Sequence, residues 1–264
     1  MIDHEYFYYI ANWKMNKSYL EAWAWIREHK KRLSDLSRDY FAHIVICPSF
    51  VSLGRFVEEL QDTSLSLGAQ NCSDHPAGAY TSEVDARSLQ EIGCNYCIIG
   101  HKERQLYYGE TTESIARKLP LLLTNNITPI ICIGEKKQLK STAHIYLELE
   151  QQLAPLITVL TENTVIEQKK ICLAYEPWWA VGSGDYPKPE VLQDILAWLS
   201  DYCMPLDPAY EIILLYGGSV TDIIAQKYDS LPFLNGYLIG SASLELQKFE
   251  KIISLRRTSN PRIL

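Results

Sequence analysis

The sequence ICLAYEPWWAVGSGDYPKPEVLQDILAW runs from residue 171 to residue 198 and contains a complete strand–loop–helix unit. Its first five residues are apolar and are followed by a glutamate and a proline, which is typical of a buried β-strand. Pro189 suits the first turn of a helix, and Val191, Ile195 and Trp198 recur on one helical face. The stretch therefore predicts a strand, a long loop and an amphipathic helix in succession.

The same alternation extends along the rest of the chain. A second helical pattern follows the possible capping residue Ser18 and places Tyr19, Trp23, Ile26 and Leu33 on one face. Short apolar segments with strand character separate such helical patterns. The predicted strands are Tyr6–Ala11, His43–Cys47, Ser64–Ala69, Tyr96–Ile99, Thr128–Cys132, Ile171–Tyr175, Ile212–Tyr216 and Tyr237–Ile239.

Strands that alternate with helices imply a parallel sheet with right-handed crossovers, and eight such units predict closure into a barrel. A length of 264 residues fits one large domain with a single core. We therefore predict an α/β fold, a (β/α)8 TIM barrel that forms a single domain over residues 1–264. An open, doubly wound sheet is the alternative that the pattern alone allows.

The composition narrows the classes of function. Hydrophobic residues make up 47% and charged residues 22% of the chain, which excludes a disordered or fibrous protein. The 25 basic and 32 acidic residues give a net charge of −7. A net-negative chain repels nucleic acid and anionic membranes, so we expect neither as a partner. A small anionic substrate at one local site remains compatible with this charge.

No targeting or metal-binding pattern stands out in the sequence. The start, Met1–Glu5, lacks the basic and apolar regions of a signal peptide, and no apolar run reaches the length of a membrane span. The seven cysteines are odd in number and lie mostly in apolar stretches, so we expect reduced core thiols. Cys94 and Cys97 form a single CxxC without a second pair, which favours buried positions over a zinc site. We expect a cytoplasmic protein.

Three candidate catalytic residues follow predicted strands, where the loops of a barrel form its active face. Lys14 would present a compact cation to an anionic ligand, and His101, at a helix start, would stay neutral and shuttle protons. Glu176 precedes a loop with two tryptophans and a Gly-Ser-Gly tip, and a carboxylate under an apolar lid suits a general base. The structural alternatives are a solvated lysine, a capping or packing histidine and a buried ion pair.

Two further loops carry small residues in succession. Gly217-Gly218-Ser219 follows the seventh predicted strand, and Gly240-Ser241-Ala242-Ser243 follows the eighth. Small residues let backbone N–H groups converge on an anion, and barrels commonly bind phosphate at these last two loops. The pair of loops indicates a phosphate site.

These residues belong to motifs whose order and spacing resemble the triosephosphate isomerase family over nearly the whole chain. The motifs are Asn12-Trp13-Lys14-Met15-Asn16, Gly68-Ala69-Gln70-Asn71, Gly78-Ala79-Tyr80-Thr81, Ile99-Gly100-His101, Cys132-Ile133-Gly134-Glu135, Ala174-Tyr175-Glu176-Pro177, Tyr216-Gly217-Gly218-Ser219-Val220 and Ser243-Leu244.

The resemblance implies an isomerase of glycolysis and gluconeogenesis that interconverts dihydroxyacetone phosphate and D-glyceraldehyde 3-phosphate through an enediol. It implies that Glu176 moves the proton between adjacent carbons, and that uncharged His101 polarises the carbonyl and relays protons between the oxygens. Lys14 would stabilise negative charge and help hold the phosphate, with Asn12 hydrogen-bonding nearby. Such proton transfer needs no metal and no organic cofactor.

The resemblance also implies roles for the residues around this centre. Glu103 would orient Lys14 from the second shell of side chains, and Thr81 would reach the active site of the partner in a homodimer. Backbone N–H groups would bind the phosphate at Gly182, Ser219, Gly240 and Ser241. A lid from Pro177 to Pro187 would exclude water so that the enediol does not eliminate phosphate. The residues assigned to the lid itself are Pro177, Trp178, Trp179, Ala180, Val181, Gly182, Ser183 and Gly184.

Several residues depart from the family pattern, and Lys102 matters most because it stands where the family usually carries Ser, directly after His101. Its ammonium group could pair with Glu176 when the lid is open, point to solvent or contact an extra oxygen of a different substrate. Ser241 replaces a glycine in the phosphate loop, and Pro187 fixes a φ angle at the end of the lid.

These departures leave two alternatives beside triose phosphate isomerisation. A divergent isomerase of this fold could act on a larger ketose phosphate, such as a tetrulose (erythrulose) phosphate, with Lys102 or the altered lid facing the additional hydroxymethyl group. A non-catalytic homologue that binds anions is the second, although the intact Lys14, His101 and Glu176 speak against it.

Overall fold

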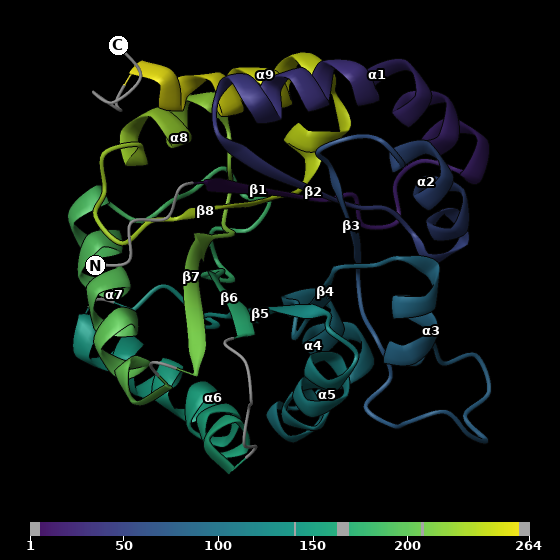
Figure 1. The fold of residues 1–264 in the computed structure, drawn as a ribbon. Helices are drawn as coiled ribbons and strands as arrows, with labels where there is room; N and C mark the ends of the chain where they lie inside the picture. Colours follow the sequence, from purple (N-terminus) through teal and green to yellow (C-terminus); the bar gives the residue numbers. More distant parts are fainter. Residues whose placement is uncertain (1–5, 140, 163–168, 207–208, 259–264) are drawn as a thin grey trace.

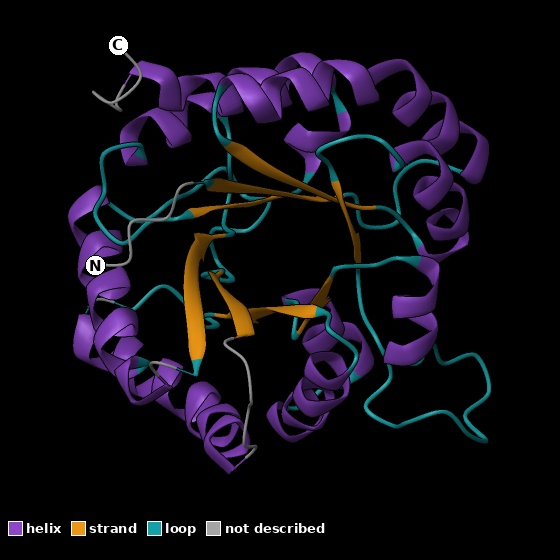
Figure 2. Ribbon diagram, in the orientation of Figure 1, coloured by secondary structure: helices purple, strands orange, loops and turns teal. Residues whose placement is uncertain are grey.

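The computed structural model describes residues 6–139, 141–162, 169–206 and 209–258, and in it eight parallel strands close into a barrel. The strands pair in chain order, and β1 closes the barrel by pairing with β8. Figure 2 shows them enclosed by a ring of helices. The strands are β1 (Phe7–Asn12), β2 (Ala42–Cys47), β3 (Ser66–Ala69), β4 (Tyr96–Ile99), β5 (Thr128–Ile133), β6 (Lys169–Tyr175), β7 (Tyr210–Tyr216) and β8 (Gly236–Ile239).

The helices lie outside the barrel and follow the strands along the chain (Figure 1). The α-helices are α1 (Tyr19–Asp39), α2 (Leu53–Leu60), α3 (Ala86–Ile92), α4 (Lys102–Tyr108), α5 (Thr112–Thr124), α6 (Thr142–Glu162), α7 (Pro189–Tyr202), α8 (Asp222–Tyr228) and α9 (Leu246–Ser254). Short 3-10 turns are η1 (Phe50–Ser52), η2 (Met204–Leu206), η3 (Ser241–Leu244) and η4 (Leu255–Thr258).

The strands separate two apolar layers because successive side chains of a strand point to opposite faces. In β1, Tyr8 and Ile10 belong to the cluster inside the barrel. The neighbouring Tyr9 and Ala11 belong to the larger cluster between the strands and the helices. Both faces of β1 are therefore covered, as parallel sheets require.

The predicted barrel is confirmed, and the predicted strands all occur, with ends that differ by at most two residues. The helix expected after Ser18 begins there with a capping box, in which Ser18 and Glu21 exchange hydrogen bonds. The predicted apolar face of this helix was partly wrong. Ile26 is buried, but Tyr19 is 43% exposed, and Trp25 supplies the buried indole instead. Tyr19 is the first residue of the helix.

Other predictions about the chain are also tested. Helix α7 begins at Pro189 as expected. All seven cysteines, including Cys94 and Cys97, are free and buried. No helix in the described ranges is long and apolar enough to cross a membrane. The predicted absence of a signal peptide at Met1–Glu5 lies outside the described residues.

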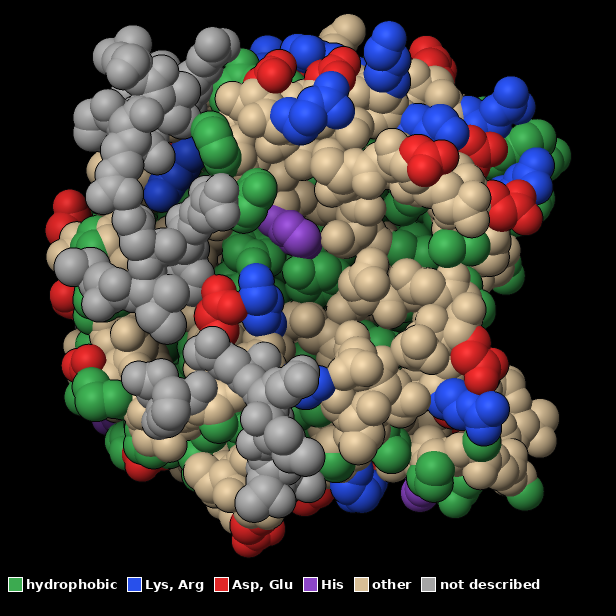
Figure 3. Space-filling view, viewed as in Figure 1, with side chains coloured by type: hydrophobic (Ala, Val, Ile, Leu, Met, Phe, Trp, Pro, Cys, Tyr) green, Lys and Arg blue, Asp and Glu red, His purple; other side chains and the backbone are tan. Residues whose placement is uncertain are grey.

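The carboxyl ends of the parallel strands meet at one mouth of the barrel, where the loops after β1, β4, β6, β7 and β8 lie close together. The loop between β3 and α3 instead projects away from the ring (Figure 1). On the face seen in Figure 3, acidic and basic side chains are interspersed, and no broad patch of one sign covers it.

Candidate active site

The structure brings Lys14, His101 and Glu176 to the same mouth of the barrel, each just after a different strand. The Nε2 atom of His101 lies 3.6 Å from Oε1 of Glu176. The Nζ atom of Lys14 lies 2.6 Å from Oε1 of Glu103, whose carboxylate is 3.5 Å from Nδ1 of His101. The four side chains thus form one connected group of two carboxylates, an imidazole and an ammonium.

His101 caps the N-terminus of α4 and is only 5% exposed. Its Nδ1 atom accepts a hydrogen bond from the backbone N–H of Glu103 at 3.3 Å. Because an acceptor nitrogen carries no proton, the neutral ring keeps its proton on Nε2, the atom that faces Glu176. The imidazole is therefore arranged as a neutral hydrogen-bond donor toward the centre of the site.

Glu176 is 2% exposed, and its carboxylate occupies a narrow space. A methyl group on Gly217 would lie 2.7 Å from Cγ of Glu176. A methyl group on Gly134 would lie 2.0 Å from the backbone carbonyl oxygen of Glu176. Within the described residues, Oε2 of Glu176 is buried without a hydrogen-bond partner. A buried carboxylate oxygen without such a partner is suited to accept a proton from a bound molecule.

Lys14 is held by its backbone as well as by Glu103. Its φ angle of 53° lies in the left-handed region, which is uncommon for lysine. Oδ1 of Asn12 accepts a hydrogen bond from the backbone N–H of Lys14 at 3.1 Å. Nε2 of Gln70 donates to the backbone carbonyl of Lys14 at 2.9 Å. Burial would raise the pKa of Glu103, but the hydrogen bond and charge of Lys14 outweigh this and hold that pKa below its usual value. Glu103 therefore stays charged beside the ammonium.

The predicted lid, Pro177–Pro187, is seated on neighbouring loops. Nε1 of Trp179 donates to the fully buried carboxylate of Glu135 at 2.7 Å, and Oη of Tyr175 donates to the same carboxylate. Burial raises the pKa of Glu135, and these hydrogen bonds oppose the increase. The indole thus ties the start of the lid to the end of β5.

The hydroxyl group of Ser219 holds the middle of the lid. It donates to the carbonyl of Ala180 at 2.6 Å and accepts from the N–H of Gly184 at 3.1 Å. At the end of the lid, Oη of Tyr228 donates to the carbonyl of Pro187 at 2.6 Å. Since Pro187 has no N–H, only its carbonyl can make a backbone hydrogen bond here.

The structure places the ammonium group of Lys102 against the lid, a contact that was not among the alternatives considered from the sequence. Its Nζ atom donates to two lid carbonyls, that of Trp178 at 3.2 Å and that of Val181 at 3.0 Å. Burial and the charge of Lys14 lower the pKa of Lys102, and the charges of Glu176 and Glu103 oppose the decrease. The ammonium group therefore neither pairs directly with Glu176 nor points freely into solvent.

The predicted phosphate-binding residues border the same mouth. Gly240 precedes the 3-10 turn that begins at Ser241, and a methyl group on Gly240 would lie 3.8 Å from Cε of Lys14. Gly182 is exposed at the tip of the lid with φ 76°. The loop after β8 thus lies beside the side chain of Lys14, and the lid tip offers an exposed glycine.

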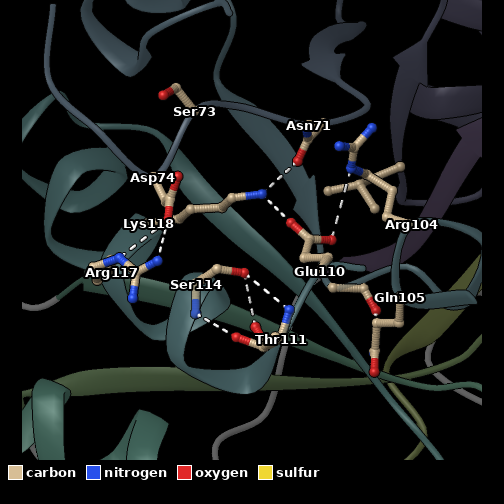
Figure 4. A network of polar contacts seen from close by, with 12 residues as sticks. Asn71, Ser73, Asp74, Arg104, Gln105, Glu110, Thr111, Ser114, Arg117 and Lys118 are labelled. Carbon is tan, nitrogen blue, oxygen red and sulfur yellow. Dashed lines mark hydrogen bonds and ion pairs between the residues drawn. The ribbon is translucent and has the colours of Figure 1, made fainter. Parts of the chain in front are cut away.

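A buried polar network supports α4 from behind (Figure 4). Nζ of Lys118 donates to Oδ1 of Asn71 at 2.7 Å and pairs with the carboxylate of Glu110. Nε of Arg104, on α4, lies 3.8 Å from Oε2 of Glu110. Hydrogen bonds and an ion pair thus join the loop after β3 to α5, and α4 adjoins this network through the Arg104–Glu110 ion pair, which is too long for a hydrogen bond.

Sequence reasoning assigned no role to Glu135, to the hydroxyl of Ser219, to Gln70 or to Tyr228. For Glu135 a signal was present, because an acid at the end of an apolar strand had singled out Glu176. No comparable pattern marks Tyr228, whose partner is a backbone carbonyl. Thr81 lies exposed on the projecting loop. Among the described residues, no group of three or more His, Cys, Asp or Glu could hold a metal ion.

Comparison with known proteins places these features in a family. The family model described as "Triosephosphate isomerase" matches residues 7–256. The triosephosphate isomerase of Aquifex aeolicus is 38% identical over 245 residues, which cover 92% of this chain and 96% of the relative. That of Nitrosococcus oceani is 35% identical, covering 91% and 94%, and that of Endomicrobium trichonymphae is 32% identical, covering 92% and 96%.

Proposed function

Because the chain belongs to the triosephosphate isomerase family and is an isomerase, we propose that it interconverts dihydroxyacetone phosphate and D-glyceraldehyde 3-phosphate. The observation that carries this proposal is the pair formed by Glu176 and His101. A buried carboxylate with a free oxygen lies 3.6 Å from a neutral imidazole donor, which is the pair that moving a proton beside a carbonyl requires.

In this mechanism Oε2 of Glu176 takes a proton from the carbon next to the carbonyl. Nε2–H of His101 donates to the carbonyl oxygen, which becomes a hydroxyl group of the enediol, and the ring then relays a proton between the two oxygens. Glu176 returns its proton to the adjacent carbon. Lys14 stabilises the negative charge that develops on oxygen, and Asn12 and Glu103 hold Lys14 in place.

Phosphate binding is assigned to backbone N–H groups of Gly182, Ser219, Gly240 and Ser241, beside the ammonium of Lys14. These groups lie on the lid and on the loops after β7 and β8. With the lid seated on them, water would be kept from the enediol, which would otherwise eliminate its phosphate. This assignment needs neither a metal nor an organic cofactor.

A homodimer is part of the proposal. Large apolar side chains are exposed on the successive loops after β1, β2 and β3: Met15 is 97%, Val51 73% and Tyr80 44% exposed. Such a group on adjacent loops suits a protein interface, and Thr81 lies beside Tyr80. The seven free, buried thiols support a reducing compartment such as the cytoplasm.

A coupled assay with D-glyceraldehyde 3-phosphate tests the proposed reaction. We expect rapid turnover by the natural chain and a loss of about 10²-fold or more in kcat for Glu176→Asp, because the shorter side chain withdraws the carboxylate by about one bond length. Glu245→Asp, at an exposed residue, is the matched control. Unchanged activity of Glu176→Asp would contradict the assignment.

The same assay with a tetrulose phosphate tests the larger substrate. The contact of Lys102 with lid carbonyls accounts for this cation without an additional hydroxymethyl group, so it gives the four-carbon alternative no support. Very weak turnover of the triose phosphate together with rapid turnover of the tetrulose phosphate would reverse this preference.

A further inference from the structure

Lys102 connects two parts of the site that the proposed mechanism treats separately. It is the first residue of α4, directly after His101, and its ammonium group reaches the lid. It contacts the carbonyl of Trp178 at 3.2 Å, inside the turn that the hydrogen bond from Ala180 N–H to Pro177 O closes, and the carbonyl of Val181, directly after that turn, at 3.0 Å. One donor group therefore binds the turn and the residue that follows it.

The fixed end of this connection is well supported. The backbone of α4 is capped by His101, and Arg104 on the same helix faces the buried Glu110–Lys118 pair. The lysine stem is half-buried, which limits its freedom. A side chain that starts from a supported helix and ends on a loop is suited to set the position of the loop.

The ammonium makes its direct contacts with neutral groups. In the described parts of the chain, no carboxylate oxygen lies within 4.0 Å of Nζ of Lys102, although Glu176 and Glu103 act on it at longer range. Hydrogen bonds from a charged donor to carbonyls are stronger than those between neutral groups. Opening the lid would break both bonds and return the ammonium to water.

We propose that Lys102 is a positioning residue that holds the lid in its closed place over the reacting carbons. This inference rests on the proposed function for its catalytic consequence, but the position of the lid itself can be measured without substrate. A serine at this position is too short to reach both carbonyls. The lid of this chain is therefore held from the His101 side as well as from Ser219.

Two substitutions isolate the donor from the rest of the side chain. Lys102→Met keeps an unbranched apolar stem and removes the charge and the donors, whereas Lys102→Arg keeps charged donors of similar reach. Hydrogen exchange of the ligand-free protein reports the lid directly through the amides of residues 178–184. We expect exchange at least 10-fold faster in Lys102→Met, near-natural exchange in Lys102→Arg, and unchanged exchange in α5 of both.

The second measurement is made during turnover. It is the ratio of inorganic phosphate released to triose phosphate isomerised. We expect this ratio to rise at least 5-fold in Lys102→Met and to return toward the natural value in Lys102→Arg, because a loosened lid admits water to the enediol. A general loss of stability would not change the ratio in this selective way.

The outcomes separate the two proposals. If the natural chain does not isomerise triose phosphate, the proposed function fails, while the exchange experiment still decides whether Lys102 holds the lid. If lid amides exchange equally fast in the natural chain and Lys102→Met, the positioning role is wrong. Exchange as fast in Lys102→Arg as in Lys102→Met would show that charged donors at this position do not hold the lid, which would also overturn the proposal.

Discussion

Gly217 determines how closely β7 can approach the proposed base. A methyl group built on it would lie 2.7 Å from Cγ and 3.1 Å from Oε1 of Glu176. Gly217 does not have a positive φ angle, so alanine is compatible with its backbone. Gly217→Ala therefore perturbs the position of a carboxylate without straining the chain that carries the methyl group.

The size of the effect follows from this overlap. Ordinary contacts begin near 3.4 Å, so the side chain of Glu176 must withdraw by about 0.7 Å. Displacing a reacting group by about 1 Å costs about 10²-fold in rate, equivalent to about 2.7 kcal/mol of transition-state stabilisation. We expect kcat of Gly217→Ala to fall about 10²-fold with little change in KM, since phosphate binding does not involve Glu176.

The assay is steady-state isomerisation with urea denaturation alongside. Gly54→Ala is the matched control, because a methyl group there meets nothing within 4 Å and the helix α2 gains a better helix former. We expect full activity in the control and a loss of at most about 1 kcal/mol of unfolding free energy in Gly217→Ala. An unchanged kcat in Gly217→Ala would refute the claim that Glu176 works from this fixed position.

Two further predictions concern stability and assembly. Burial, aided by the charge of Lys170, lowers the pKa of His43 to about 4 in the folded protein. Because the unfolded ring titrates near pH 6.5, the unfolded chain binds more protons than the folded chain between pH 6.5 and 4. The free energy of unfolding should fall by about 2 kcal/mol over that window and stay constant above it, and urea titrations should show a smaller fall in His43→Gln. If the homodimer forms through the loop after β3, Thr81→Arg should sediment as a monomer, and its activity should fall at least about 10-fold. Thr158→Arg, on the outer face of α6, is the control and should change neither the assembly nor the activity. A dimeric Thr81→Arg protein would refute this interface.

Strand and helix positions were predictable because their causes are local. The run 171–175 is apolar and short, Pro189 starts a helix and Ser18 caps one, and each signal acts within a few residues. The errors arose where the burial of a residue depends on packing against distant parts of the chain. Tyr19 has the right spacing for the apolar face of α1, but it is the first residue of the helix and remains 43% exposed.

The proposed site was predictable to the extent that its chemistry is attached to strand ends. The order of strands alone brings Lys14, His101 and Glu176 to one mouth, and the structure does so. The residues that hold the lid were harder to predict from the sequence. Glu135 accepts a hydrogen bond from the indole of Trp179, and Ser219 bonds the N–H of Gly184 and the carbonyl of Ala180. These groups come together only when the lid is folded. Nothing in their local sequence specifies those partners.

Lys102 shows why a residue type does not determine its partner. Its long side chain allows the ammonium group to bind any of several acceptors. From the sequence, Glu176, solvent and an oxygen of the substrate were all possible partners. In the folded protein Glu176 is enclosed by Gly217 and Gly134, and its carboxylate faces Nε2 of His101. The lid carbonyls are the acceptors that remain at the surface of the site. A cation that strengthens the local positive charge around Lys14 is thereby directed to hold the lid, although the chain as a whole carries a charge of −7.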